Sequence, residues 1–138
     1  MGDSVLQHRC ILIVDDDPLN TFALASYLET FDLKIYTAGN GFDALDLLQQ
    51  HQEIELVLMD IMMPVMDGYE TIKQIRENPA MASIPVIAVT ARAMKGDREK
   101  CLRAGATDYI SKPVNLKELL EKMEQLVSQP KTPMNDRQ

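Results

Sequence analysis

The sequence contains no tryptophan and few other aromatic residues, and it lacks the long apolar runs of membrane proteins. Four Tyr and three Phe supply all the aromatic side chains, too few to predict a stacking platform for nucleic acid. No stretch approaches the ~20 apolar residues of a membrane-spanning helix, and the N-terminus lacks the apolar segment of a signal peptide. We therefore expect a soluble, cytoplasmic protein with no membrane contact.

Basic residues and cysteines are also scarce. Fourteen Lys and Arg against 21 Asp and Glu give a net charge of −7, and an acidic chain repels the phosphate backbone of nucleic acids. Direct nucleic-acid binding is therefore not expected, whereas clustered carboxylates favour a cation site. Cys10 and Cys101 are too few and too far apart for a disulfide framework or a zinc site. Two reduced thiols are typical of a cytosolic protein.

The 138 residues suffice for one domain with its own core. We place this domain at residues 10–128. Residues 1–9 are polar and without pattern, and we expect them to be a leader or linker. Residues 129–138 contain two prolines and are expected to form a disordered tail.

Short apolar runs alternate with helical patterns along the domain. Continuous apolar runs predict buried strands at 10–14 and 56–59, and strands are also predicted at 33–37, 85–89 and 107–111. Apolar spacing and capping residues predict helices at 18–30, from 40 through 48, through 72 and 75 up to 78, at 93–104 and at 115–127. Five strand–helix units with short connections predict an α/β fold, a doubly wound five-stranded parallel sheet with helices on both faces.

Polar side chains follow four of the predicted strands. Asp15 and Asp16 follow the first strand, and Asp60 follows the third. Thr90 and Lys112 follow the fourth and fifth strands. Ligands of open α/β sheets bind outside the carboxyl ends of the strands. We therefore expect these five side chains to surround one site.

The residue types at this edge point to phosphoryl transfer. Three close carboxylates repel one another unless a cation neutralises them, and Mg²⁺ prefers oxygen ligands and bridges to phosphate oxygens. A hydroxyl and a lysine supply a donor and a positive charge for phosphoryl oxygens. One carboxylate would remain available as the nucleophile.

Each of these residues has a simpler explanation when it is considered alone. Acids at 15–17 suit a helix N-terminus, Asp60 suits a turn, Thr90 a strand end, and Lys112 a solvated loop. We favour the shared site because all of them meet at one edge of one sheet, in the roles that a single reaction requires.

The chain resembles response-regulator receiver domains of two-component phosphorelay systems, the chemotaxis-protein-like group, over about residues 10–127. The motifs that carry the resemblance are Ile13-Val14-Asp15-Asp16, Met59-Asp60-Ile61-Met62-Met63-Pro64 with Met66-Asp67-Gly68, Val89-Thr90-Ala91, and Ser111-Lys112-Pro113. The resemblance implies a flavodoxin-like sheet of strand order 2-1-3-4-5.

The resemblance also implies the metal ligands and the acceptor. Asp60 would accept the phosphoryl group as an acyl phosphate. Mg²⁺, for which Mn²⁺ could substitute, would be bound by Asp16 and Asp60, by Asp15 partly through water, and by the backbone carbonyl of Met62.

Further roles follow from the same resemblance. Lys112, joined to Pro113 by a cis bond, would pair with Asp60 and then with the phosphoryl group. Thr90 would turn inward to the phosphoryl oxygen, and Tyr109 would follow as the switch aromatic. The alternative for Tyr109 is an ordinary half-buried strand tyrosine.

The resemblance implies a signalling switch that catalyses its own phosphorylation and dephosphorylation. The phosphodonor would be a phosphohistidine on a histidine kinase or phosphotransfer protein. A downstream protein would bind the face formed by the fourth helix, fifth strand and fifth helix, with Arg92, Lys95, Arg98 and Tyr109 as candidates. A solvated helix face is the alternative for these basic residues.

Two positions are expected to tune the site, namely Met62 and Arg92. Met62 cannot orient an attacking water, which predicts slow loss of phosphate. Residues 91–98 resemble receivers fused to hybrid histidine kinases, and we favour such a parent over a single-domain regulator.

Two other functions compete with this assignment. A Mg²⁺-dependent phosphatase acting through an aspartyl phosphate usually carries a second Asp two residues after its nucleophile, where this chain has Met62. A receiver-like module that is never phosphorylated would not need the complete set of acids, hydroxyl and lysine. An EF-hand lacks its alternate ligands and central Gly here, and a dinucleotide fold lacks G-x-G-x-x-G.

Overall fold

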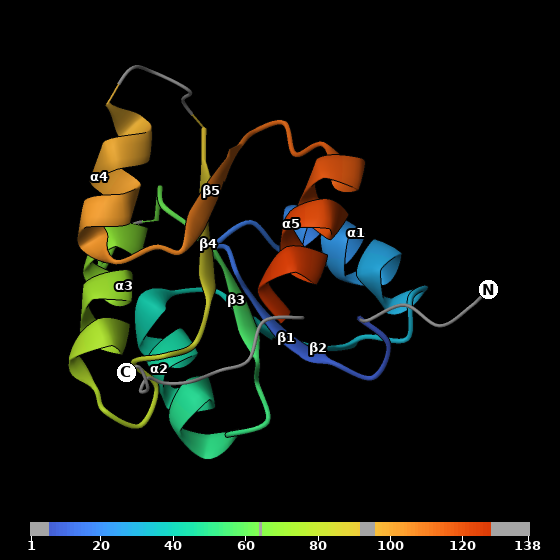
Figure 1. Cartoon of the computed structure of the whole chain (residues 1–138), viewed down its shortest axis with the longest axis horizontal. Helices are drawn as coiled ribbons and strands as arrows, with labels where there is room; N and C mark the ends of the chain where they lie inside the picture. The colour runs from blue at the N-terminus through green and yellow to red at the C-terminus, as the bar shows by residue number, and fades with distance from the viewer. Residues whose placement is uncertain (1–5, 64, 92–95, 128–138) are drawn as a thin grey trace.

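The computed structural model describes residues 6–63, 65–91 and 96–127, in which strands and helices alternate (Figure 1). The strands are β1 (Cys10–Val14), β2 (Lys34–Ala38), β3 (Leu56–Asp60), β4 (Val86–Thr90) and β5 (Asp108–Ser111). The helices are α1 (Pro18–Glu29), α2 (Gly41–Gln50), α3 (Gly68–Glu77), α4 (Asp97–Ala104) and α5 (Leu116–Val127).

The five strands form one parallel sheet in the order β2-β1-β3-β4-β5. The predicted fold class and strand order are therefore confirmed. Because β2 and β3 lie on opposite sides of β1, the chain reverses its direction of growth there. The edge beyond the carboxyl ends of β1 and β3 is the topological switch point, where ligands bind in such sheets.

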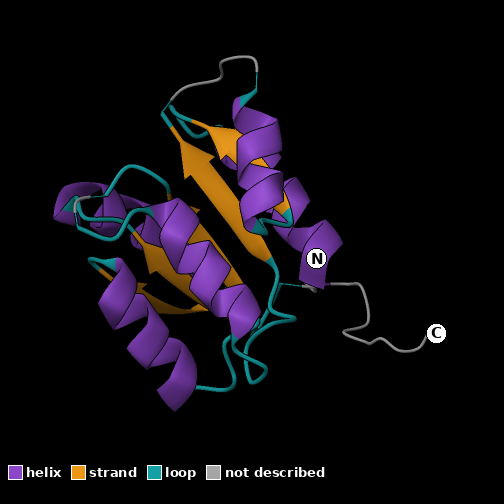
Figure 2. Ribbon diagram, turned by 90° about the vertical axis from the view of Figure 1, so that its left-hand side faces the viewer, coloured by secondary structure: helices purple, strands orange, loops and turns teal. Residues whose placement is uncertain are grey.

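Helices cover both faces of the sheet (Figure 2). Along each strand alternate side chains point to opposite faces, so the strands contribute to two separate cores. On one face Ile11, Ile13 and Leu58 pack with Leu28 of α1 and Leu119 of α5. On the other face the sheet packs against α2, α3 and α4 through residues that include Leu12, Val57, Ala44, Ile72 and Cys101.

Side-chain caps start several helices next to the carboxyl edge. The carboxylate of Asp17 accepts the Leu19 N–H, and Pro18 is the first residue of α1. Asn115 accepts the Glu118 N–H at 2.9 Å at the start of α5. These bonds satisfy N–H groups that have no partner within the helix, and they fix the loops that carry the polar residues.

The structure differs most from the predicted boundaries at two places, while several other strand and helix ends are shifted by one residue. Gly96 has a φ of 98°, so the helix predicted from residue 93 begins at Asp97; residues 93–95 lie outside the described part of the chain. Leu6 is only 1 % exposed and packs in the core, and the His8 N–H donates to the Asp32 carbonyl at 2.9 Å. The predicted leader is therefore part of the fold from Leu6 onward, because one apolar side chain anchors an otherwise polar segment.

The remaining sequence predictions on the fold concern the tail, the thiols and the membrane. The tail at 129–138 lies outside the described residues. Cys10 and Cys101 are both free and buried. Within the ranges that the structure describes, no helix has the length and apolar character needed to cross a membrane.

Candidate phosphoryl-transfer site

Polar side chains from four strands meet at the carboxyl edge of the sheet. Asp60 and Thr90 are the last residues of β3 and β4, whereas Asp15 follows β1 and Lys112 follows β5. Asp15, Asp60 and Thr90 are 7 %, 3 % and 4 % exposed. Buried polar groups cost free energy unless they are compensated, so their presence together marks a functional edge.

The three acids predicted to bind a cation are close together. Asp15, Asp16 and Asp60 each offer a carboxylate oxygen, and these atoms all lie within 4.8 Å of one another. Asp16 is exposed while the other two are buried, so the cluster opens to solvent on the side of Asp16. A divalent cation with oxygen ligands and several waters fits this arrangement.

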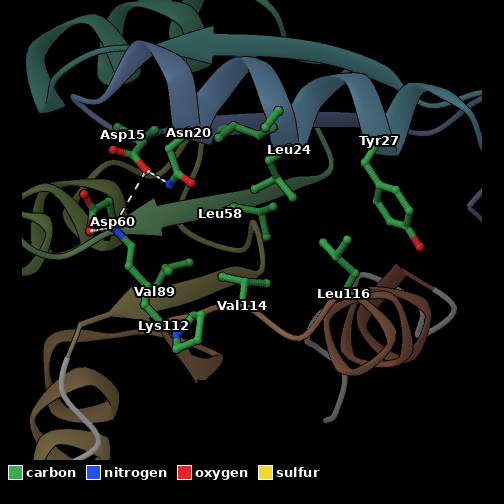
Figure 3. Close-up of a pocket in the computed structure, with 14 residues that line it drawn as sticks. Asp15, Asn20, Leu24, Tyr27, Leu58, Asp60, Val89, Lys112, Val114 and Leu116 are labelled. Atoms are coloured by element: carbon green, nitrogen blue, oxygen red, sulfur yellow. Dashed lines mark hydrogen bonds and ion pairs between the residues drawn. The ribbon is translucent and has the colours of Figure 1, made fainter.

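Lys112, which follows β5, extends toward Asp60 and Asp15 (Figure 3). Its Nζ lies 3.5 Å from Asp60 Oδ1 and 3.9 Å from Asp15 Oδ2. The Lys112–Pro113 bond is cis, as predicted. The three carboxylates and this one ammonium together leave two negative charges, which one Mg²⁺ would balance.

Asp15 is held by two donors that sequence reasoning did not consider. The Asp17 N–H donates to its Oδ1 at 2.9 Å, and the Asn20 side-chain amide donates to its Oδ2 at 2.6 Å. Asn20 is the third residue of α1, and the cap at Asp17 sets the direction of that turn. The sequence did carry a signal for this contact, because Asn20 is a polar residue in the first helical turn after the strand that ends at Asp15.

Burial raises the pKa of the Asp60 carboxyl above its ordinary value of 3.8. The Lys112 ammonium opposes this shift, and the charge of Asp15 adds to it. The Met62 N–H, 3.3 Å from Asp60 Oδ1, also favours the charged form. One ammonium against three carboxylates leaves negative charge in excess, so the residues present fit a cation here.

Gly68 brings the start of α3 directly against the end of β3. A Cβ at this position would lie 2.5 Å from the Asp60 carbonyl oxygen and 2.6 Å from Ile61 Cα. The Gly68 N–H donates to the Ile61 carbonyl at 2.9 Å. The motif was recognised in the sequence, but its physical reason, a backbone contact behind Asp60, is visible only in the structure.

Thr90 and Tyr109 lie where the sequence placed them. Thr90 pairs in register with Ser111, and its carbonyl accepts the Lys112 N–H at 2.7 Å. Tyr109 is half-buried in β5 and packs against the core on the α3 and α4 face. Of the predicted basic candidates, Arg98 is exposed on α4, whereas Arg92 and Lys95 lie outside the described residues.

The sequence matches the family described as the response regulator receiver domain over residues 11–124. It is 38 % identical over 113 residues to the polar-differentiation response regulator DivK of Brucella anthropi, covering 82 % of this chain and 91 % of that protein.

Solved structures agree with this match. The receiver domain of the sensor histidine kinase PA1611 of Pseudomonas aeruginosa, described with a magnesium ion coordinated in its active-site cleft, is 32 % identical with a TM-score of 0.81, covering 88 % of this chain and 99 % of that one. A second solved structure contains the receiver domain of Ssk1 of Saccharomyces cerevisiae together with the histidine phosphotransfer protein Ypd1. The match to it is 29 % identical with a TM-score of 0.82 and covers 96 % of each chain.

Proposed function

Because the chain belongs to the family of response regulator receiver domains, we propose that Asp60 is its phosphoacceptor and that phosphorylation there switches a binding surface. The protein is a receiver domain of two-component signal transduction. The observation that carries the proposal is the convergence of Asp15, Asp16 and Asp60 with Lys112 at the switch point of the sheet.

We assign Asp16 and Asp60, with Asp15 partly through water and the Met62 carbonyl, as the residues that hold Mg²⁺ or Mn²⁺. The bound cation would lower the repulsion between the carboxylates and the incoming phosphoryl oxygens. Asp15 supports this role because its two oxygens already accept hydrogen bonds, which hold it in place.

The chain's own residues perform the transfer by positioning and charge. A carboxylate oxygen of Asp60 attacks the phosphorus of a phosphohistidine; the new O–P bond forms as the P–N bond breaks, and the imidazole leaves with the electron pair. Lys112 then pairs with the phosphoryl oxygens instead of with Asp60. The hydroxyl of Thr90 turns inward and donates a hydrogen bond to a phosphoryl oxygen. The side chain of Tyr109 then moves with it as the switch aromatic.

A protein donor is supported by the apolar surface around the acids. Leu19 and Phe22 on α1 are 81 % and 72 % exposed, and Met62 and Val65 beside β3 are 65 % and 93 % exposed. Exposed apolar residues gathered around a charged site mark a protein interface. We propose that a histidine kinase or phosphotransfer protein binds here and delivers its phosphohistidine to Asp60.

The downstream partner is assigned to the face of α4, β5 and α5, where Arg98 is exposed and Tyr109 half-buried. We place this exchange in the cytoplasm. The domain catalyses its own phosphorylation and dephosphorylation, and Met62, which cannot orient a water, keeps the second reaction slow. A hybrid histidine kinase stays the favoured parent.

The test is labelling by a radioactive small-molecule phosphodonor, acetyl phosphate, with Mg²⁺. The wild-type chain should acquire a hydroxylamine-sensitive label, and Asp60→Asn should lose it completely. Asp46→Asn, which alters an exposed acid on α2, is the matched control and should be labelled normally. Undiminished labelling of Asp60→Asn would refute Asp60 as the acceptor. Sustained turnover of small phosphomonoesters would instead indicate a phosphatase.

A further inference from the structure

A cleft lies between α1 and α5 and opens at one end onto Asp15 and Asp60 (Figure 3). Its volume is about 620 Å³, within the range of roughly 300–1,000 Å³ that is usual for small-molecule sites. The cleft occupies the face of the sheet opposite α2, α3 and α4, and it extends from Asp15 and Asp60 to Tyr27 and Leu116.

The body of the cleft is apolar. Its floor is formed by side chains of the sheet, Ile13, Leu58 and Val89, which are at most 8 % exposed. Leu24 and Tyr27 of α1 face Val114 and Leu116 across it. An apolar occupant would remove this surface from water, which contributes about 25 cal/mol for each Å² buried.

The charged end of the cleft is negative. Asp15, Asp60 and Lys112 all line it, which leaves one negative charge, and the nearby carboxylate of Asp16 makes the excess two. Lys112 contacts both lining acids only at ion-pair distances of 3.5 and 3.9 Å. An anionic head group would therefore meet two buried carboxylates, whereas a cationic one would compensate them.

We propose that this cleft binds a small molecule with an apolar body and a protonated primary amine. The ammonium group lies beside Asp15 and Asp60, and the body fills the space between Leu24, Tyr27 and Val114. Phosphoryl transfer uses the carboxylates at the edge of the sheet but does not require this apolar extension behind them.

Binding of the amine opposes binding of Mg²⁺, because both cations are attracted by the same carboxylates. The amine is therefore an inhibitor of phosphorylation. This regulatory consequence rests on the proposed function, whereas the binding itself does not.

The probes are phenylbutylamine, phenylbutyrate, which has the same body and an opposite charge, and butylamine, which has the head group with a short chain. Amide NMR spectra of the full chain without Mg²⁺ should show saturable shifts at cleft residues with phenylbutylamine. Phenylbutyrate and butylamine should each bind at least about tenfold more weakly. Phenylbutylamine should also raise the apparent Kd for Mg²⁺ in proportion to its concentration. Equal binding of phenylbutyrate would overturn the inference.

Substitution of Ala23 locates the site. Ala23 is exposed on α1 and lines the cleft, so Ala23→Phe should fill it and abolish amine binding, while Ala23→Met should weaken binding partly. Ser26→Phe adds the same ring to an exposed position of α1 outside the cleft lining and should bind the amine normally. Unchanged affinity in a folded Ala23→Phe, judged by its dispersed amide spectrum, would overturn the proposal. So would amide shifts of the cleft caused by a phosphodonor protein but by none of the probes.

Labelling by acetyl phosphate and Mg²⁺ without amine is measured in parallel. Failure of that labelling would refute the proposed function alone, since amine binding is observed without Mg²⁺ or phosphate. Labelling that proceeds normally in saturating amine would overturn the inhibitory role of the amine and leave the proposed function standing.

Discussion

The two ends of the sheet differ in how well charged side chains that are withdrawn from water are compensated by hydrogen bonds and opposite charges. At the amino ends of β4 and β5, the half-buried guanidinium of Arg76 lies among acceptors. It donates to the carbonyls of Ile84, Gly105 and Ala82 at 2.6, 2.8 and 2.9 Å and to Thr107 Oγ1 at 3.2 Å. At the carboxyl ends, three carboxylates lie together, and the one ammonium of Lys112 is at ion-pair distance from two of them, Asp15 and Asp60. Burial shifts a pKa at both ends: it lowers that of Arg76 and raises that of Asp60.

Withdrawing a charge from water costs free energy at both ends, but it stabilises the fold at one end and prepares a cation site at the other. Hydrogen bonds to a charged donor are worth about 1.5–3 kcal/mol each, so the contacts of Arg76 tie α3 to the segments that precede β4 and β5. The acids at the other end also accept hydrogen bonds, but a single ammonium leaves their negative charge in excess, and a cation completes the compensation. Local rules of polar satisfaction are broken at functional sites and kept elsewhere.

The largest effect is expected at the satisfied end. Arg76→Met leaves the carbonyls of Ala82, Ile84 and Gly105 without their charged donor, and should lower the free energy of unfolding by about 3 kcal/mol, measured by urea denaturation. Arg103→Met, which removes an exposed Arg from α4, should change it little. Because Arg76 is remote from the acids, Mg²⁺ affinity should be unaffected. If Arg76→Met lost no more stability than Arg103→Met, the hydrogen bonds of Arg76 would not stabilise the fold as described.

An intermediate effect is expected for the residue that orients Asp15. Asn20→Ala removes the donor at 2.6 Å from Asp15 Oδ2, so the carboxylate is less well oriented, and the Kd for Mg²⁺ should rise about tenfold. Ser26→Ala, on the same helix, should leave it unchanged. Titration of each variant with Mg²⁺, followed by amide NMR, measures the difference. An unchanged Kd in Asn20→Ala would mean that Asp17 alone orients Asp15.

The smallest effect should appear in the pH dependence of stability without Mg²⁺. The pKa of Asp60 in the folded chain is above its ordinary value of 3.8, so the folded state binds this proton more tightly than the unfolded state. The contribution of Asp60 to the free energy of unfolding therefore falls as pH rises from about 3.8 through its folded pKa, by at most about 1.4 kcal/mol per pH unit.

The comparison that isolates this contribution is wild type against Asp60→Asn, unfolded in urea at several pH values. In this window the variant should gain stability relative to wild type as the pH increases. Saturating Mg²⁺ should reverse the order, since it binds the wild-type acids more tightly. A difference that stays constant with pH would contradict the assigned pKa shift.

The sequence predicted the strands, the helices and the convergence of the acids because these follow from local patterns, whereas the strand order was implied by the family resemblance. Continuous apolar runs such as 10–14 and 56–59 are buried strands, and the residue after such a strand lies at its carboxyl edge whatever the packing. The αL conformation of Gly96 shortened α4 relative to the prediction, and Leu6 joined the core from a polar segment. A single Gly inside a helical pattern, or a single Leu in a polar one, is too weak a signal for either.

The sequence by itself determined which side chains lie at the ends of which strands, because strand alternation and helix capping depend on residues that are close together in the chain. What only the tertiary structure decided is how those side chains are compensated. The cleft between α1 and α5 joins segments that no local pattern relates, and the bond from Asn20 to Asp15 and the backbone contact behind Gly68 depend on how a helix start packs against a strand end. The physical reason is that periodicity fixes direction along one element, whereas distance and burial depend on how two elements pack.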